Sequence, residues 1–328
     1  MTRALAMVSG GLDSILAAKL IKDQGIDVIG ICFRSYFFNE SSAIKMTKQI
    51  DIPLEVIDFS PAHMEMVKNP KHGWGKNINP CIDCHTMMMT YAGELLEKFN
   101  ADFIITGEVL NQRPMSQNKQ ALNIVKKESG YAEKILRPLC AKNLDITQME
   151  IDGLVDRENL LDISGRSRKK QMELAEAWGI TEYPSPAGGC RLTEPNYAIK
   201  LKDALNHNSE LEENEINMLK FGRHFRTANG TKILASRTGD EANEMRPLIT
   251  ENYTEFNTKN YSGSTVYIQG EFSPEDAEIA AMIAVRYSKG KDEDSVEVLY
   301  GNVGEKHNKT ITTKSIADEE LAKLNVVK

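Results

Sequence analysis

The sequence predicts two domains: an α/β domain built on a doubly wound parallel sheet, and a smaller α+β domain after it. Three observations carry this prediction. Short apolar runs alternate with helical stretches through the first half, as in parallel sheets covered on both faces. Two glycines separate the first apolar run from the first helical stretch. From about residue 212 the pattern changes to short extended segments. We place the domains at residues 1–205 and 212–328, since 328 residues are enough for two packed cores.

The elements of the first domain follow from apolar runs and helical spacing. Strands are expected at residues 3–8, 27–33, 54–58, 101–106 and 134–139. Helices are expected from the glycine pair to about residue 24, and at 42–50, 84–99, 115–128 and 167–178. A polar stretch at 60–80 interrupts the series, and residues 183–195 hold three prolines and read as a loop.

The second domain shows shorter extended segments. Strands are expected at residues 231–236, 264–269, 295–300 and 309–313, with one helix at 274–288. Strands mixed with a helix in this way predict a small α+β domain.

Composition limits the function. The net charge is −7, and most of the excess negative charge lies after residue 200. Broad electrostatic wrapping of nucleic acid is therefore excluded, and an RNA site has to be a local basic patch. The sequence shows no membrane span and no secretory signal, so we expect a cytoplasmic protein. Five cysteines in a long chain favour reduced thiols or ligands over a disulfide framework.

The glycine loop, residues 9–14, is the most informative motif. It reads Ser9, Gly10, Gly11, Leu12, Asp13 and Ser14. Glycines let the backbone approach an anion closely, and the start of the following helix attracts negative charge. The loop lacks the Gly-Lys-Ser/Thr of the common phosphate loop and the Gly-x-Gly-x-x-Gly of dinucleotide sites. It therefore predicts nucleotide chemistry of another type.

A second loop is expected beside it. Thr106, Gly107 and Glu108 end a predicted buried strand. Ligands of open α/β sheets bind at the carboxyl ends of the strands. We therefore expect this loop to face the nucleotide.

Three cysteines are candidate ligands. Cys81 and Cys84 lie three residues apart at the opening of a helix, where the dipole is expected to lower their pKa. Cys190 follows a loop with two glycines, residues 188–189. An iron-sulfur cluster, a zinc site completed by His85 or His72, and a persulfide or disulfide relay all remain open. Cys32 and Cys140 are expected to be buried core residues.

With the glycine loop, residues 79–84 (Asn-Pro-Cys-Ile-Asp-Cys), Thr106-Gly-Glu and Ala-Gly-Gly-Cys at 187–190, the chain resembles the PP-loop ATP pyrophosphatases. Among these it resembles the iron-sulfur-dependent tRNA thiolation enzymes, in a 2-thiouridine synthase-like branch with an extra C-terminal domain. The resemblance implies a PP-loop, HUP-like fold of Rossmann type. It also implies a 4Fe-4S cluster on Cys81, Cys84 and Cys190, whose fourth iron binds the transferred sulfur.

The C-terminal region carries a second resemblance. Phe221-Gly-Arg-His-Phe and the segment 232–243 are similar to the RNA-binding domain of ribosome quality-control factors. The usual Gly-Arg-Asn of that domain is replaced here by Ser236, Arg237 and Thr238. This makes residues 212–328 a candidate RNA-binding domain.

The resemblance implies a mechanism with ATP and Mg²⁺. The glycine loop holds the β and γ phosphates, and Asp13 places magnesium or orients the loop. Backbone near Phe33 and residues 106–108 cradles adenine and the α phosphate. A uracil carbonyl oxygen of tRNA attacks the α phosphate, and sulfur then displaces AMP. The sulfur donor would be sulfide or a sulfurtransferase.

A flipped base needs a basic rim to hold its RNA. The candidate contacts are Arg113, Arg166, Arg168, Lys169 and Lys170. His72 and His85 are expected to have structural roles. Two other functions remain open: an adenylating enzyme with a small-molecule acceptor, and a non-catalytic nucleotide- and RNA-binding regulator.

Overall fold

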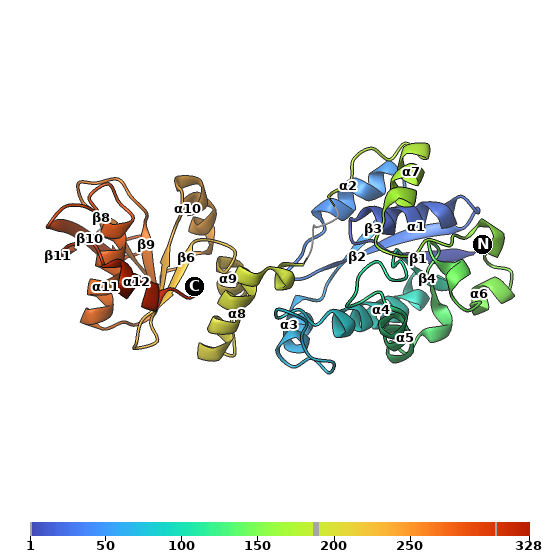
Figure 1. Cartoon of the computed structure of the whole chain (residues 1–328), viewed down its shortest axis with the longest axis horizontal. Helices are drawn as coiled ribbons and strands as arrows, with labels where there is room; N and C mark the ends of the chain where they lie inside the picture. Colours follow the sequence, from blue (N-terminus) through green and yellow to red (C-terminus); the bar gives the residue numbers. More distant parts are fainter. Residues whose placement is uncertain (1, 186–189, 306) are drawn as a thin grey trace. The chain divides into compact units, whose positions relative to one another are not determined.

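The chain folds into two compact units, Met1–Thr193 and Glu194–Lys328. The computed structural model describes residues 2–185, 190–305 and 307–328 (Figure 1). In this part of the chain, no helix combines the length and apolar character that a membrane span requires.

The first unit is built on a five-stranded parallel sheet (Figure 1). Its strands are β1 (Arg3–Met7), β2 (Asp27–Arg34), β3 (Leu54–Asp58), β4 (Phe103–Thr106) and β5 (Ile135–Leu136). Its helices are α1 (Leu12–Lys22), α2 (Ser41–Gln49), α3 (Ser60–Lys68), α4 (Cys81–Lys98), α5 (Lys119–Glu128), α6 (Gln148–Ile151) and α7 (Lys169–Ala177). The strand order is β3-β2-β1-β4-β5, and the paired strands are all parallel. The predicted doubly wound sheet is confirmed.

Helices cover both faces of this sheet because its strands are apolar on both sides. Ala4 and Ala6 of β1 belong to a core cluster that includes residues of α1, α2 and α7. Leu5, between them, belongs to a second cluster that includes residues of α4 and α5. Neighbouring side chains of β1 therefore point to opposite faces of the sheet, because side chains alternate along a β-strand.

Several predicted boundaries in this unit need correction. The strand expected at 134–139 covers only Ile135–Leu136, and the helix expected at 115–128 begins at Lys119. The polar stretch at 60–80 contains α3, which buries His63, Met64 and Val67. Helix α3 accommodates Pro61 because the backbone N–H that proline lacks would have no hydrogen-bond partner within the first turn of a helix. Helix α4 begins at Cys81 instead of residue 84, so both cysteines lie in its first turn.

The second unit is a six-stranded antiparallel sheet in the order β11-β10-β8-β9-β7-β6. Its strands are β6 (Arg223–Arg226), β7 (Lys232–Ala235), β8 (Tyr253–Thr258), β9 (Val266–Gln269), β10 (Val296–Asn302) and β11 (Lys309–Thr313). Its helices are α8 (Pro195–His207), α9 (Glu213–Met218), α10 (Gly239–Met245), α11 (Pro274–Arg286) and α12 (Asp318–Leu324). Helix α11 packs Ala277, Ala280 and Ala284 into the core that contains Phe225 and Phe256. The predicted small α+β domain is confirmed.

The units divide after Thr193, before α8, whereas the predicted first domain extends to residue 205. The reason lies in a buried lysine of α8. The Lys200 ammonium donates hydrogen bonds to the carbonyls of Leu219, Phe221 and Gly222 at 3.0–3.2 Å. Burial lowers the pKa of Lys200 to about 8. These contacts tie α8 to the chain that enters β6.

Candidate functional site

The candidate site lies where the strand order of the first unit reverses. β1 and β4 are neighbours, with Met7 paired to Thr106, and the chain continues from β1 to β2 on one side and from β4 to β5 on the other. Such switch points are where open α/β sheets bind ligands. The glycine loop follows β1 and residues 106–108 end and follow β4 (Figure 1), so the structure brings the two predicted loops together.

Gly10 sets the shape of the glycine loop. Its φ is +78°, which favours glycine. A Cβ there would lie 2.5 Å from Ser42 Cβ and 2.6 Å from the backbone nitrogen of Ala43. Gly11 is the N-cap of α1 and provides no side-chain cap, while the Ser14 hydroxyl donates to the Gly11 carbonyl at 2.8 Å. The first turn of α1 therefore keeps backbone N–H groups for an anion.

Gly107 lets the second loop approach the first. A Cβ on Gly107 would lie 2.4 Å from the backbone nitrogen of Ser14 and 2.5 Å from the carbonyl carbon of Asp13. These are backbone atoms of α1, so they cannot turn away as a flexible side chain would. The close approach depends on glycine.

We predict that Gly107→Ala destabilises the protein by about 1–3 kcal/mol, because the added methyl forces backbone atoms apart. Urea unfolding measures this. Gly239→Ala is the control, since a Cβ at Gly239 meets no atom within 4 Å. An equal free energy of unfolding for the two variants would refute the close approach.

Asp13 is held by a chain of polar side chains. Gln112 Nε2 donates to Asp13 Oδ2 at 2.6 Å, and Gln171 Nε2 donates to Gln112 Oε1 at 2.8 Å. Arg168 contacts Asp13 Oδ1 at 3.4 Å. Gln171 is fully buried, and no partner is found in the described chain for its Oε1 or for Arg168 Nε. Neither glutamine was predicted from the sequence, because both lie outside any motif.

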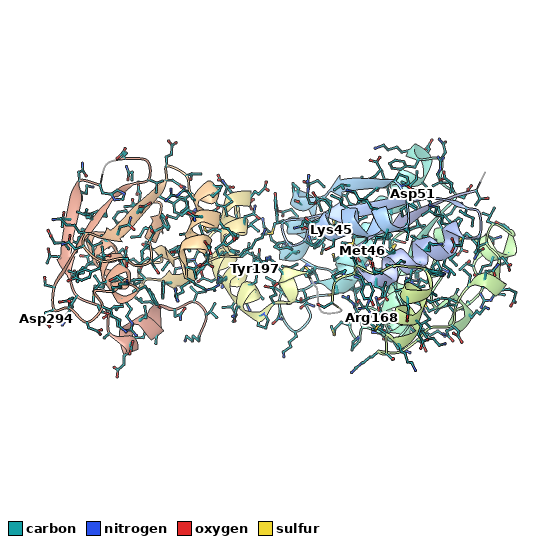
Figure 2. The ribbon with its side chains drawn as sticks, turned by 90° about the horizontal axis from the view of Figure 1, so that it is seen from above. Lys45, Met46, Asp51, Arg168, Tyr197 and Asp294 are labelled. Carbon is teal, nitrogen blue, oxygen red and sulfur yellow. The ribbon has the colours of Figure 1, made fainter. Side chains whose placement is uncertain are left out.

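The predicted basic rim is only partly on the surface. Arg168, labelled in Figure 2, has a side chain that is 16% exposed and pairs with Asp13. It is therefore placed as a neighbour of the glycine loop, not as an outer contact. The exposed members are Arg113, Arg166, Lys169 and Lys170. Lys170 pairs with Asp162 at 2.8 Å, and Lys169 lies 3.9 Å from Glu173.

Glu108 points into a buried ion pair. One carboxylate oxygen, Oε2, accepts a hydrogen bond from Arg137 Nε at 2.8 Å. The other, Oε1, is hydrogen-bonded to His85 Nδ1, also at 2.8 Å. Burial alone would raise the pKa of Glu108, but the Arg137 charge and the His85 hydrogen bond outweigh it and lower the pKa to about 2. Only the backbone of this loop is left to contact a nucleotide. Phe33 is likewise buried, with its ring tilted against that of Phe59, so only its backbone can serve as predicted.

Cys81 and Cys84 lie in the first turn of α4. Asn79 Nδ2 donates to Cys81 Sγ at 3.3 Å, and His63 Nε2 lies 3.2 Å from Cys84 Sγ. Burial raises the pKa of Cys84 well above its usual range, and the nearby charges of Cys190 and Cys81 raise it further. For Cys84 the predicted lowering of the pKa by the helix dipole is therefore wrong, because burial outweighs it. Cys190 therefore lies close enough to Cys84 for its charge to affect the pKa of that thiol.

The described residues show no preformed metal site that would support the predicted cluster or zinc ion. In residues 2–185, 190–305 and 307–328, no three His, Cys, Asp or Glu side chains are grouped to hold one metal ion. Residues 187–189 of the Ala-Gly-Gly-Cys motif lie outside the described residues. The donors themselves suit a cluster: the thiols of Cys81 and Cys84 lie in the first turn of α4, where Asn79 and His63 contact them, and Cys190 is a third free thiol.

The remaining cysteines and histidines behave as expected. Cys32 and Cys140 are buried, and burial raises their pKa values to about 12 and about 11. His72 Nδ1 bonds Asp83 Oδ1 at 2.8 Å, and His85 bonds Glu108 as described. Both histidines therefore have the structural contacts that were predicted.

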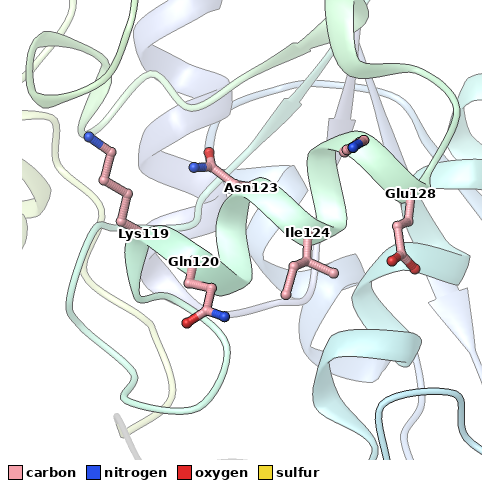
Figure 3. A pocket seen from close by; sticks show the side chains of 6 residues that line it. Lys119, Gln120, Asn123, Ile124 and Glu128 are labelled. Carbon is pink, nitrogen blue, oxygen red and sulfur yellow. The ribbon is translucent and has the colours of Figure 1, made fainter.

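A shallow hollow along α5 carries no comparable chemistry. It is lined by Lys119, Gln120, Asn123, Ile124, Lys127 and Glu128 (Figure 3). All six come from one helix, so no groups converge on a ligand from different elements.

A parallel sheet with a glycine loop at its switch point defines a nucleotide-binding class of α/β protein. Within that class, residues 1–151 match the family described as thiamine biosynthesis protein (ThiI). Residues 222–324 match the RNA-binding domain of NFACT proteins. Both predicted resemblances, to PP-loop thiolation enzymes and to an RNA-binding domain of quality-control factors, are confirmed.

Curated relatives are similar over part of the chain. The tRNA-specific 2-thiouridylase MnmA 1 of Clostridium botulinum (strain Okra / Type B1) is 34% identical over 119 residues, 32% of this chain and 33% of the relative. The MnmA of Nitrosomonas europaea (strain ATCC 19718 / CIP 103999 / KCTC 2705 / NBRC 14298) is 28% identical over 174 residues, 48% of this chain and 47% of the relative. The chain thus spans about a third to a half of these relatives.

A solved 4-thiouridine synthetase–RNA complex with bound ATP is 15% identical, with a TM-score of 0.36. The match covers 55% of this chain and 52% of that one. A TM-score this low does not establish a shared fold.

Proposed function

We propose that this protein is an ATP-dependent tRNA thiolation enzyme. The observation that carries the proposal is the glycine loop at the switch point, with Asp13 oriented by Gln112 and Arg168. The matches of residues 1–151 and 222–324 support the same class of activity.

The glycine loop would hold the pyrophosphate end of ATP. Its backbone N–H groups and the start of α1 favour anionic oxygens. Asp13, on the first turn of α1, would place a magnesium ion or fix the loop, and Arg168 would add positive charge beside it. A preorganised set of this kind stabilises the charge that develops as pyrophosphate leaves.

The reaction would then run in two displacements. A carbonyl oxygen of a uridine attacks the α phosphorus, and pyrophosphate leaves with the electron pair of the broken P–O bond. A sulfide-level donor next attacks the activated carbon, and AMP leaves with the original oxygen. The product is a thiouridine, and no oxidant or reductant is consumed.

Cys81, Cys84 and Cys190 would hold a 4Fe-4S cluster, which when bound would supply an iron site for the transferred sulfur. The amide N–H of Asn79 suits negatively charged sulfur at Cys81, and the His63 tautomer with its proton on Nε2 would do the same at Cys84. Anaerobic purification followed by iron and sulfide analysis tests this. A colourless protein with stoichiometric zinc would overturn the cluster assignment.

The second unit would contribute RNA contact. Arg223 stacks 4.3 Å from the Tyr287 ring and donates to the Ser236 carbonyl at 3.2 Å. Thr238 caps α10 by accepting a hydrogen bond from the Glu241 N–H. Threonine therefore replaces the usual asparagine at this position with another residue that can cap a helix. Arg237 pairs with Glu241 at 3.4 Å.

The decisive experiment incubates the protein with bulk tRNA, ATP and sulfide. We expect pyrophosphate release and a thionucleoside in the digested tRNA by mass spectrometry. Pyrophosphate release with a small molecule and no thionucleoside would instead support the small-molecule acceptor. RNA binding without pyrophosphate release under any condition would support the regulator.

A further inference from the structure

A buried histidine links the end of β2 to the sulfur of Cys84. His63 lies on α3 and is fully buried. Its Nδ1 is hydrogen-bonded to Ser35 Oγ at 2.7 Å, and its Nε2 lies 3.2 Å from Cys84 Sγ. Ser35 directly follows β2, whereas Cys84 lies in the first turn of α4. Three elements that are distant in the sequence therefore meet through one imidazole ring.

Aromatic side chains hold the His63 ring in one orientation. The Phe59 ring stacks on it with the ring centroids 4.7 Å apart, and the rings of Phe37 and Phe38 meet it edge-on at 5.6 and 5.5 Å. In a close-packed interior such a ring cannot turn without displacing its neighbours. Burial among apolar groups also disfavours a charged imidazole. One ring nitrogen of His63 therefore carries the proton, and the other is an acceptor.

The contacts of Ser35 favour the tautomer with the proton on Nε2. The backbone of Ser35 pairs with that of Phe38 in both directions, at 3.0 and 3.3 Å, which fixes Ser35 beside the ring. The Phe37 N–H donates to the Ser35 hydroxyl oxygen at 3.5 Å, so the hydroxyl proton is left to donate to His63 Nδ1. Nε2 then presents an N–H to Cys84. The other neutral tautomer would direct a lone pair at that sulfur, which is electron-rich when it is deprotonated or binds a metal.

We propose that Ser35 and His63 form a relay of two hydrogen bonds that holds an N–H donor on the Cys84 sulfur and so positions that sulfur as a ligand. The inference rests on the proposed function, which gives Cys84 a metal or cluster to bind. The outer hydrogen-bond partners of a ligand fix its orientation, and their loss weakens metal binding. Ser35 and His63 act through Cys84, so both are positioning residues.

The tautomer of His63 is measured by ¹⁵N NMR of the metal-free protein at neutral pH. We expect Nδ1 to show the chemical shift of an unprotonated nitrogen and Nε2 that of an N–H. Ser35→Ala removes the donor to Nδ1 and should move part or all of the ring to the other tautomer. Ser35→Thr keeps a hydroxyl and should restore the wild-type spectrum. A wild-type His63 that carries its proton on Nδ1 would overturn the inference.

Ser288→Ala is the matched control for Ser35→Ala. Ser288 is also a buried serine whose hydroxyl accepts from a backbone N–H, that of Gly290 at 3.0 Å, and donates, to the Val285 carbonyl at 2.9 Å. It belongs to the second unit. We expect its replacement to leave the spectrum of His63 unchanged.

Binding of Co²⁺ to the metal-free protein gives a second readout, since ligation by thiolates produces charge-transfer absorption. We expect His63→Leu to weaken the Co²⁺ affinity about 10- to 100-fold and Ser35→Ala to weaken it about 2- to 10-fold. His63→Gln keeps an N–H donor and should retain more affinity than His63→Leu, and Ser288→Ala should match the wild type. Melting temperatures show whether each variant is folded.

The outcomes separate the relay from the proposed function. Equal Co²⁺ affinity of the wild type and His63→Leu, or a wild type without thiolate-bound Co²⁺, would overturn the inference, while a thionucleoside made by the wild type would still support the proposed function. The expected NMR and Co²⁺ results without any thionucleoside would support the relay and refute the proposed activity.

Discussion

Asp13→Asn is expected to lower the rate of pyrophosphate release by about 100- to 1,000-fold, the usual cost of losing one preorganised electrostatic group at a reacting centre. The substitution keeps the size of the side chain and removes its charge. The carboxylate accepts from Gln112 at 2.6 Å and pairs with Arg168 at 3.4 Å. Asparagine would leave Arg168 beside the loop without its counter-ion and could not bind magnesium as a carboxylate does.

The measurement is single-turnover pyrophosphate release with saturating ATP and tRNA. Asp23→Asn is the matched control, because Asp23 lies at the C-terminal end of the same helix, where its exposed carboxylate pairs with Lys19. We expect that control to react at the wild-type rate. Full activity in Asp13→Asn would contradict the placement of Asp13 at the reacting phosphates.

The hydrogen bonds of Asp13 also suggest a graded series. Gln171→Leu removes the buried donor to Gln112 and leaves the charge of Asp13 in place. Its effect on the rate should therefore be smaller than that of Asp13→Asn. The comparison separates the effect of orienting the Asp13 carboxylate on the rate from the effect of having a carboxylate there at all.

Local signals predicted the framework of the site. The apolar run before Ser9 and the helical spacing after Ser14 located β1, the glycine loop and α1, because all three depend on neighbouring residues. The place of Cys81 and Cys84 at the opening of a helix was also predicted, although that helix begins three residues earlier than expected. These features lie within short segments, where the sequence determines the local structure.

Contacts between distant segments could not be predicted. Gln171 reaches Gln112 across 59 residues, and Gln112 reaches Asp13 across 99. Arg168 appeared to belong to an exposed basic run, because its pairing with Asp13 depends on how α7 packs beside α1. His63 was missed because it lies in α3, in a stretch whose polar composition suggested a loop.

Glu108→Gln is expected to destabilise the protein by about 3–5 kcal/mol, because it leaves the buried guanidinium of Arg137 without its counter-ion. The side chains of Glu108 and Arg137 are each only 5% exposed. Urea unfolding measures the change. Glu65→Gln is the control, since Glu65 pairs with Lys68 while 66% exposed, and such surface pairs contribute about 0–1 kcal/mol. A Glu108→Gln variant as stable as the control would refute a buried, ionised Glu108.

The same pair predicts a pH dependence whose sign follows from the lowered pKa. In the unfolded chain Glu108 titrates near its usual pKa of about 4.3, whereas Arg137 and His85 lower the pKa to about 2 in the folded protein. The stabilisation is therefore complete above about pH 5 and is lost as the pH falls toward 2. Glu108→Gln lacks this titration, so its difference in stability from the wild type should shrink in that window. Because Glu108 directly follows Gly107, which packs against the first turn of α1, loss of the pair should also loosen the glycine loop and weaken ATP binding. A stability difference that stays constant from pH 6 to pH 3 would show that another group holds Arg137.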